Sequence, residues 1–128
     1  MKRINFSSGG KWEPLIGYSR AVRVGRHVFV SGCTAADADG TVSGDAYAQT
    51  TKTLETVRLA LEGVGASLAD VVRTRMFLTN INDWEAVGRA HGEVFGQILP
   101  AATMVEVSRL IAFEMLLEIE VDAVCLLD

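Results

Sequence analysis

Polar side chains with catalytic potential fall in two segments near the C-terminus. The first is Pro100-Ala101-Ala102-Thr103-Met104-Val105-Glu106-Val107, and the second is Glu118-Ile119-Glu120. A glutamate such as Glu118 can accept a hydrogen bond from water and help that water attack an electrophile. The chain offers no comparable Ser/His/Asp or Cys/His arrangement and no phosphate-binding glycine motif.

The composition is that of a small acidic globular protein. The 128 residues predict one domain, residues 1–128, with 49% hydrophobic and 22% charged residues. No apolar run reaches ~18 residues, so we expect no transmembrane helix. Residues 1–6 lack the apolar stretch of a signal peptide. The sequence therefore predicts a cytoplasmic protein with no membrane partner.

Net charge and cysteine spacing argue against two further classes. The formal net charge is -4 and the pI is about 5.1, so the basic footprint of a nucleic-acid-binding protein is missing. Cys33 and Cys125 lack the CxxC spacing of a zinc site. We expect both cysteines in or beside strands, as small apolar residues.

The remaining sequence supplies the elements that must position these residues. Runs rich in β-branched and aromatic residues predict strands, and apolar repeats along one face predict helices. Asp45 is the expected N-cap of the first helix, and Asn82 with Glu85 resembles a capping box for the second. The expected strands are 1–6, 20–24, 27–33, 71–78, 103–107 and 116–126, the expected helices are 45–63 and 82–96, and residues 7–17 are expected to form a loop.

This order, ββ(β)αβαββ, predicts an α+β sandwich in which both helices cover one face of the sheet. Alternation along the later strands places apolar residues on that face and charges on the other. The charged face is either solvated, as in many antiparallel sheets, or meets partner subunits, with its arginines neutralising its acids. The charged residues in question are Arg73, Arg75, Glu118, Glu120 and Asp122.

Five fragments, in the same order, resemble the Rid family of reactive intermediate deaminases, also called the YjgF family. Each fragment is weak alone, but together they cover nearly the whole chain and are specific. The fragments are 16–21 (Ile-Gly-Tyr-Ser-Arg-Ala), 30–32 (Val-Ser-Gly), 78–84 (Leu-Thr-Asn-Ile-Asn-Asp-Trp), 105–107 (Val-Glu-Val) and 118–120 (Glu-Ile-Glu).

The resemblance implies a chorismate-mutase-like fold, with a mostly antiparallel mixed sheet and two helices on one face. It also implies a homotrimer whose ligand pockets lie between subunits. Active members hydrolyse 2-imino acids or their enamine tautomers to 2-oxo acids and ammonia. Because an imine carbon is already electrophilic, no metal or cofactor is implied. Such a site must hold a small molecule, supply water and stabilise charge as the tetrahedral adduct forms.

Position by position, the resemblance assigns Glu118 as the catalytic residue that positions the attacking water. Tyr18 matches a tyrosine that lines the pocket, and Gly32 would let a ligand approach the backbone. Structural alternatives stay open: Tyr18 could pack over the hairpin, Ser31-Gly32 could simply end a strand, and Glu118 could pair with an arginine of the sheet. The residues implied to bind substrate are Tyr18, Ser31, Gly32, Cys33, Ala102, Thr103 and Met104, with Thr103 and Met104 acting through backbone N–H groups.

Two positions depart from the family pattern. Active members have a carboxylate-binding arginine where this chain has Ala102, and alanine cannot supply that bidentate fork. A pocket asparagine of the second helix falls on Gly88. Arg20 and Arg109 are candidates to bring a guanidinium from another direction. We therefore expect little activity on ordinary 2-imino acids.

Three functions are compatible with the sequence. The chain could hydrolyse an imine, an enamine or a similar small electrophile by means of Glu118 and backbone donors. It could instead be a non-catalytic trimer that binds a small metabolite in the same cleft. Endoribonuclease, a label that some family members carry, fits the acidic composition poorly.

Overall fold

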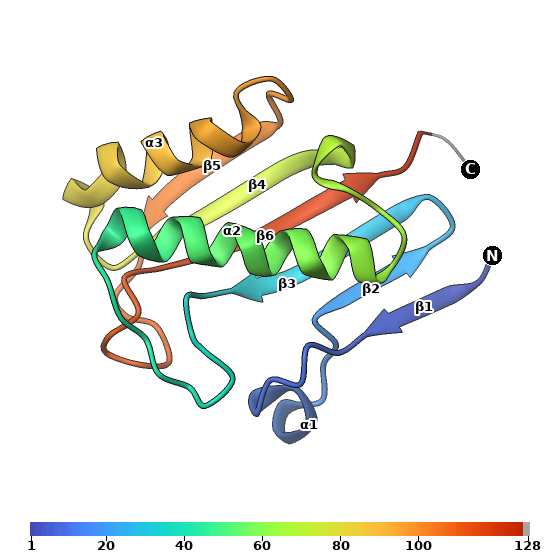
Figure 1. The fold of residues 1–128 in the computed structure, drawn as a ribbon, viewed down its shortest axis with the longest axis horizontal. Helices are drawn as coiled ribbons and strands as arrows, with labels where there is room; N and C mark the ends of the chain where they lie inside the picture. Colours follow the sequence, from blue (N-terminus) through green and yellow to red (C-terminus); the bar gives the residue numbers. More distant parts are fainter. Residues whose placement is uncertain (127–128) are drawn as a thin grey trace.

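The computed structural model describes residues 1–126; residues 127 and 128, the end of the expected domain, lie outside the described part. Strands form one sheet in the order β1-β2-β3-β6-β4-β5 (Figure 1). Neighbouring strands are antiparallel except β4 and β5, which are parallel. The elements are β1 (Arg3–Phe6), α1 (Trp12–Ile16), β2 (Ala21–Val24), β3 (His27–Cys33), α2 (Ala46–Gly63), β4 (Val71–Leu78), α3 (Trp84–Phe95), β5 (Ala101–Glu106) and β6 (Leu117–Val124), with 3₁₀ turns at Leu68–Asp70 and Ile81–Asp83.

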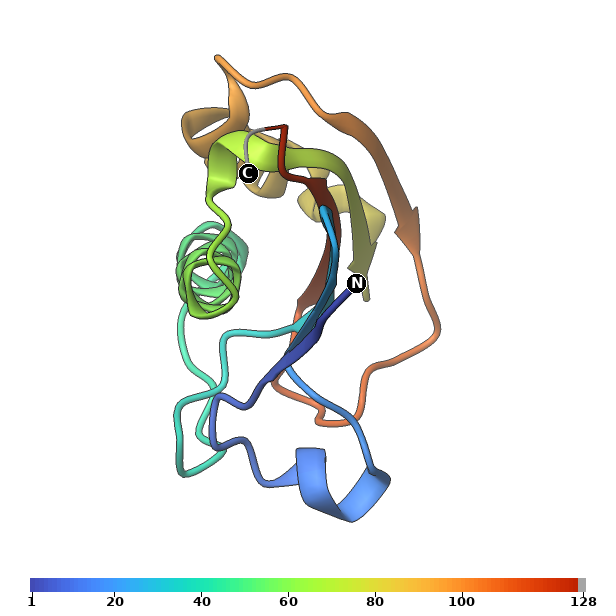
Figure 2. The ribbon, with the colours of Figure 1, turned by 90° about the vertical axis from the view of Figure 1, so that its right-hand side faces the viewer.

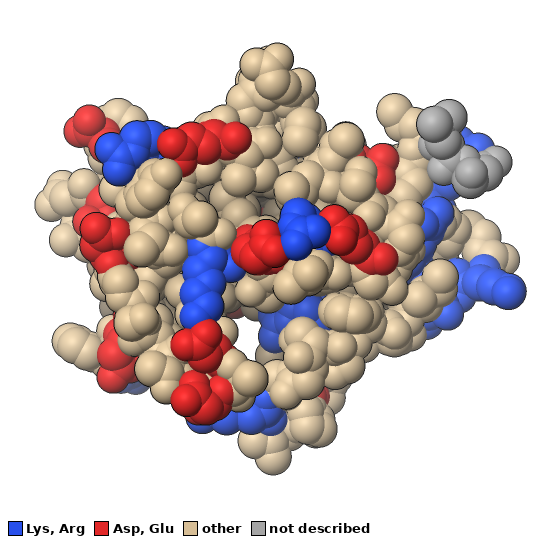
Figure 3. All heavy atoms as spheres, in the orientation of Figure 1, with Lys and Arg blue, Asp and Glu red and all other residues tan. Residues whose placement is uncertain are grey.

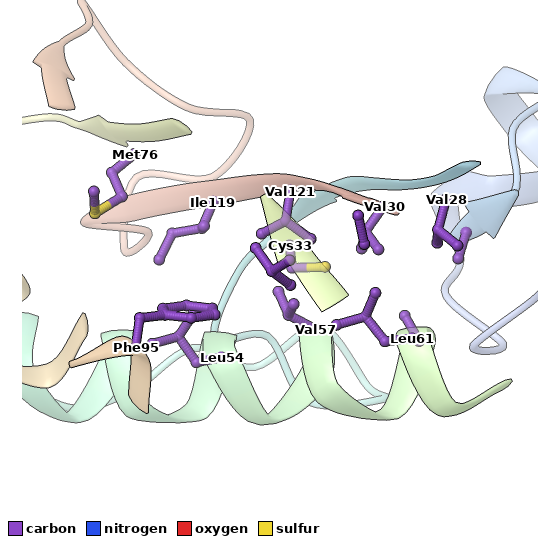
Figure 4. Packing of buried hydrophobic residues seen from close by; sticks show 14 of the residues in the cluster. Val28, Val30, Cys33, Leu54, Val57, Leu61, Met76, Phe95, Ile119 and Val121 are labelled. Atoms are coloured by element: carbon purple, nitrogen blue, oxygen red, sulfur yellow. The ribbon is translucent and has the colours of Figure 1, made fainter. Parts of the chain in front are cut away.

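The two long helices, α2 and α3, lie on the same side of the curved sheet (Figure 2), which confirms the predicted α+β arrangement. The core fills the space between these helices and the sheet. Leu54, Val57 and Leu61 of α2 face Val30 of β3 and Val121 of β6 (Figure 4), and all are buried. Full burial of each such side chain contributes about 1.5–3 kcal/mol, so this layer fixes where α2 sits above the sheet.

Along β6, buried residues alternate with half-buried ones, so every second side chain points away from the helices. Glu118, Glu120 and Asp122 are on that outer side. Arg75 Nη1 lies 3.1 Å from Asp122 Oδ2 and 3.6 Å from Glu120 Oε1, so this arginine neutralises acids of its own chain. Glu118 stands opposite Phe77 in the β4–β6 register, so the strand pairing does not place an arginine across from it.

Residues 7–17, expected to form a loop, contain the short helix α1. Gly17 ends the helix in the left-handed region at φ 93°, and its N–H donates to the carbonyl of Glu13 at 2.8 Å. The Glu13 side chain turns back to accept N–H bonds from Ser8 and Gly10. This turn depends on one buried carboxylate, which periodicity along the chain does not reveal.

The start of α3 also differs from expectation. Asn80 rather than Asn82 supplies the side-chain cap, because its Oδ1 accepts the N–H of Asn82 at 2.9 Å and opens a 3₁₀ turn. α3 then begins at Trp84, and Asp83 makes no side-chain capping bond. The expected cap of α2 is confirmed: Asp45 Oδ1 accepts the N–H of Ala48 at 2.9 Å. Within residues 1–126, the structure contains no helix with both the length and the apolar character to cross a membrane.

Candidate functional site

A cavity of about 900 Å³ opens where β3 ends, beside the N-terminal segment and below α2. Figure 3 shows a hollow below α2, in the lower half of the view. Its walls come from segments far apart in the sequence, within 6–20, 31–40, 56–59 and 111–118. The predicted site residues that line this cavity are Tyr18, Ser31, Gly32, Cys33 and Glu118.

Glu118 lies directly against the backbone of Gly32. A Cβ atom added at Gly32 would stand 1.8 Å from Glu118 Oε2, so no larger residue fits without moving the carboxylate. The β3–β6 register shifts between Val30 and Cys33, and such an irregularity re-aims side chains locally. Burial raises the pKa of Glu118; Arg20 acts in the opposite direction and Glu120 adds to the rise.

Arg20 is buried, with 8% of its surface exposed, and its donors are largely used by the protein. Nη1 donates to the carbonyl of Gly32 at 2.5 Å, and Nη2 donates to Tyr18 Oη at 3.2 Å. Nε donates to Ser8 Oγ at 3.4 Å and lies 3.8 Å from Glu13 Oε2. This guanidinium therefore ties the N-terminal segment to the strand end that carries Gly32.

Glu13 is the acidic partner of this network and was not anticipated from the sequence. It is 3% exposed, and its Oε2 accepts from Ser8 Oγ at 2.6 Å and from the N–H of Gly10 at 3.1 Å. Burial opposes ionisation, but these hydrogen bonds outweigh it and lower the pKa of Glu13. The sequence feature that could have indicated this network is an acid, Glu13, and an arginine, Arg20, on either side of Tyr18.

Tyr18, Ser31 and Cys33 line the same wall, and they differ in their hydrogen bonds and in their ionisation. The Tyr18 hydroxyl accepts from Arg20, so its own proton is available to a ligand. Ser31 Oγ donates to the carbonyl of Ser19 at 2.7 Å and is thus held by the backbone. Burial raises the pKa of Cys33 to about 11, against the influence of Arg20, so its thiol is neutral and a poor nucleophile near pH 7.

The structure places the predicted site residues of the first segment, 102–104, away from this cavity. Ala102, Thr103 and Met104 are on β5, at the sheet edge, whereas the cavity lies by β3 and β6. Ala102 and Thr103 are exposed. Arg109, the other candidate guanidinium, is exposed on the loop after β5 and does not line the cavity. Within one chain, the two halves of the predicted site are therefore separate.

Apolar side chains make up much of the cavity wall, which no pattern in the sequence predicts. Phe6, Trp12 and Leu59 line it together with the polar residues above. They come from the end of β1, from α1 and from the outward side of α2, so no local pattern links them. In residues 1–126, no cluster of three or more His, Cys, Asp or Glu residues is arranged to hold a metal ion.

A mixed sheet covered on one side by two helices, with a cavity at the end of β3, defines an α+β protein of the YjgF-type fold. The chain belongs to the Rid, or YjgF, family: a family model described as Endoribonuclease L-PSP matches residues 10–125. The crystal structure of Rv2704 from Mycobacterium tuberculosis, described as a member of the YjgF/YER057c/UK114 family, superimposes with a TM-score of 0.89. It is 46% identical, and the match covers 96% of this chain and 99% of that one.

Two curated relatives support the same assignment. A RutC family protein of Pyrococcus horikoshii is 35% identical over 94% of this chain and 95% of its own length. A protein of Acinetobacter baylyi named 3-aminoacrylate deaminase RutC is 36% identical over 77% of this chain and 79% of its own length. The family therefore includes a protein named for deamination.

Proposed function

We propose that this protein hydrolyses an imine or enamine that lacks an α-carboxylate, giving a carbonyl compound and ammonia. The observation that carries the proposal is the half-buried Glu118 carboxylate, held against Gly32 in the wall of a cavity that also presents the Tyr18 hydroxyl. The family relative named as a deaminase supports this class of reaction.

The proposed reaction needs only water and one base. Glu118 accepts a proton as the water oxygen bonds to the imine carbon, and it returns this proton to the nitrogen, which gives a tetrahedral carbinolamine. The same carboxylate then takes the hydroxyl proton and delivers it to the nitrogen as the C–N bond breaks, so that ammonia leaves as the carbonyl forms: R₂C=NH + H₂O gives R₂C=O + NH₃. A raised pKa makes Glu118 a stronger base than an exposed glutamate, which favours proton transfer from water.

The charges around the cavity favour a substrate without a carboxylate. Ala102 stands where the family resemblance expects the carboxylate-binding arginine. Arg20 donates to Gly32, Tyr18 and Ser8, so a ligand carboxylate would have to compete with these bonds.

The experiment that tests this function compares two imines that differ only by the carboxylate. 2-Iminobutyrate is generated in place by a threonine dehydratase, and propan-1-imine by an amine oxidase acting on propylamine. We expect the purified protein to accelerate carbonyl formation from propan-1-imine and to act little on 2-iminobutyrate. The reverse preference would overturn the carboxylate-free assignment. Binding of either compound without turnover would favour a non-catalytic metabolite-binding protein.

We also propose a homotrimer, in which β5 of one copy lies near the cavity of the next. This arrangement would bring the Ala102–Met104 segment of one chain to the Glu118 wall of another, which one chain alone does not do. The expected mass in solution is three times the 13.8 kDa of one chain, measured by light scattering after gel filtration. A monomer at micromolar concentration would contradict this assembly.

A further inference from the structure

The cavity has a polar end and an apolar remainder. Tyr18, Ser31 and Glu118 form the polar end, where the proposed chemistry takes place. The remaining wall contains large apolar side chains, of which Ile16, Leu59 and Ile111 are more than half exposed. The apolar residues that line the cavity are Phe6, Trp12, Ile16, Leu59, Ile111 and Met115. Solvent-exposed apolar groups that converge on one cavity are typical of a binding site.

Part of this apolar wall is fixed in place before any ligand binds. The Phe6 ring lies against Gly63 of α2, and a Cβ atom added at Gly63 would stand 2.4 Å from Phe6 Cδ1. Glycine at position 63 thus allows the ring to approach the helix closely, next to the turn of α2 that carries Leu59. A wall held in this way loses little conformational freedom when a ligand contacts it.

The volume of the cavity is larger than a minimal imine requires. At about 900 Å³ it is in the upper part of the range for sites that take drug-sized ligands, ~300–1,000 Å³. Within a single chain, a ligand as small as propan-1-imine, with its nitrogen at Glu118, would leave most of the apolar wall uncovered. Filling that space with hydrocarbon would strengthen binding by roughly fourfold for each buried CH₂ group.

The charged groups at the polar end of the cavity disfavour a ligand whose acid lies there. The Arg20 guanidinium is already hydrogen-bonded within the protein, whereas Lys11 is a separate cation of the wall that lies over the Trp12 ring. The carboxylate of Glu118 would repel a second anion at the polar end. An uncharged ligand avoids these costs.

We propose that the apolar part of this cavity binds an aryl or alkyl substituent, of about six carbons or more, on an uncharged ligand whose polar group lies at Glu118. The substrate class is then a hydrophobic imine or enamine rather than a small amino-acid derivative. The inference rests on the proposed function for the chemical nature of that polar group, but not for the presence of the apolar site itself.

The test is a binding measurement with stable amides, which imitate the size and polarity of the C=N group but are not turned over. Phenylacetamide, acetamide and phenylacetate are titrated by calorimetry into the intact protein in its native assembly. We expect phenylacetamide to bind at least tenfold more tightly than acetamide, which lacks the ring, and than phenylacetate, which carries the charge.

Leu59→Glu places a carboxylate in the apolar wall and is expected to weaken phenylacetamide binding at least tenfold. Leu59 is 51% exposed, so the substitution should leave the fold intact. Leu15→Glu is the matched control, because Leu15 is 80% exposed and does not line the cavity. It is expected to bind phenylacetamide as the unmodified protein does.

Equal affinity for phenylacetamide and acetamide would overturn the proposal, as would unchanged binding by Leu59→Glu. Tight binding of phenylacetate would overturn its restriction to uncharged ligands. These outcomes are separate from failure of the proposed function. Selective binding of phenylacetamide without hydrolysis of any imine would support the apolar site and contradict the proposed hydrolase activity. Hydrolysis without preference for apolar substituents would support the hydrolase activity and contradict the apolar site.

Discussion

Glu118→Gln is expected to lower the hydrolysis of a carboxylate-free imine by about 100- to 10,000-fold, the usual contribution of a positioned general base. The amide keeps the shape of the side chain but cannot accept a proton from water. Phenylacetamide affinity should change little, because an uncharged ligand does not depend on the charge. Initial rates of carbonyl formation, together with calorimetric affinities, measure the two effects separately.

The pH dependence of the unmodified protein provides a second measurement of the same role. A general base acts in its ionised form, so activity should rise with pH through the pKa of Glu118. Burial raises that pKa above the ordinary glutamate value of 4.5, and the acid limb of kcat/KM should therefore lie above pH 4.5. This limb is expected to disappear in Glu118→Gln.

Two further variants distinguish a catalytic role of Glu118 from a nonspecific effect of changing this part of the sheet. Glu120 is on the same strand, but its carboxylate pairs with Arg75 at 3.6 Å, so Glu120→Gln should keep activity within about twofold. Gly32→Ala retains Glu118 but inserts a Cβ atom 1.8 Å from the position of its Oε2. Because the Glu118 carboxylate is displaced, the rate of imine hydrolysis should fall although the base itself is still present. Equal rates for Glu118→Gln and Glu120→Gln would remove Glu118 from the mechanism.

The parts of the fold that could be predicted from sequence are those governed by regular patterns. Alternation on 71–78 and a one-sided apolar repeat after Asp45 follow from burial of one face, and the structure confirms both elements. Helix α1 was missed because it depends on hydrogen bonds to the buried Glu13 side chain. The cap at Asn80 was missed because Asn82 offers the same chemistry two residues later.

Some residues of the candidate site could also be predicted from the sequence, and others could not. Tyr18, Ser31-Gly32 and Glu118 could be singled out by resemblance to family motifs, and the structure brings them into one cavity. Ala102 to Met104 belong to the same motif but are on the edge strand β5, so their place in a site depends on chain assembly. The apolar wall could not be predicted, because Phe6 and Leu59 reach the same cavity only when the Phe6 ring packs against Gly63 of α2.

Arg20→Met is expected to lower the free energy of unfolding by about 3–5 kcal/mol, the usual cost of removing one member of a buried ion pair. The side chains of Arg20 and Glu13 are only 10% and 3% exposed. Methionine fills much of the volume but leaves the Glu13 carboxylate buried without its cation. It also removes the donor to the carbonyl of Gly32, against which Glu118 lies. Urea unfolding at fixed protein concentration measures the loss.

Arg23→Met is the matched control for this effect. Arg23 also donates to backbone carbonyls, to Gly25 at 2.8 Å and to Val64 at 3.0 Å, but among residues 1–126 no buried acid is paired with it. Its replacement is expected to cost about 1–2 kcal/mol, from the lost hydrogen bonds alone. An Arg20→Met variant no less stable than Arg23→Met would show that the pairing with Glu13 contributes nothing.

The double variant Glu13→Gln/Arg20→Met distinguishes the cost of an unpaired buried charge from the cost of lost hydrogen bonds. A neutral glutamine can still accept from Ser8 and Gly10 and carries no charge that needs a partner. The double variant should therefore be more stable than Arg20→Met alone. If the two variants are equally unstable, the loss comes from the missing donors to Gly32 and Tyr18, and the arginine acts mainly by holding the strand end that carries the Glu118 site.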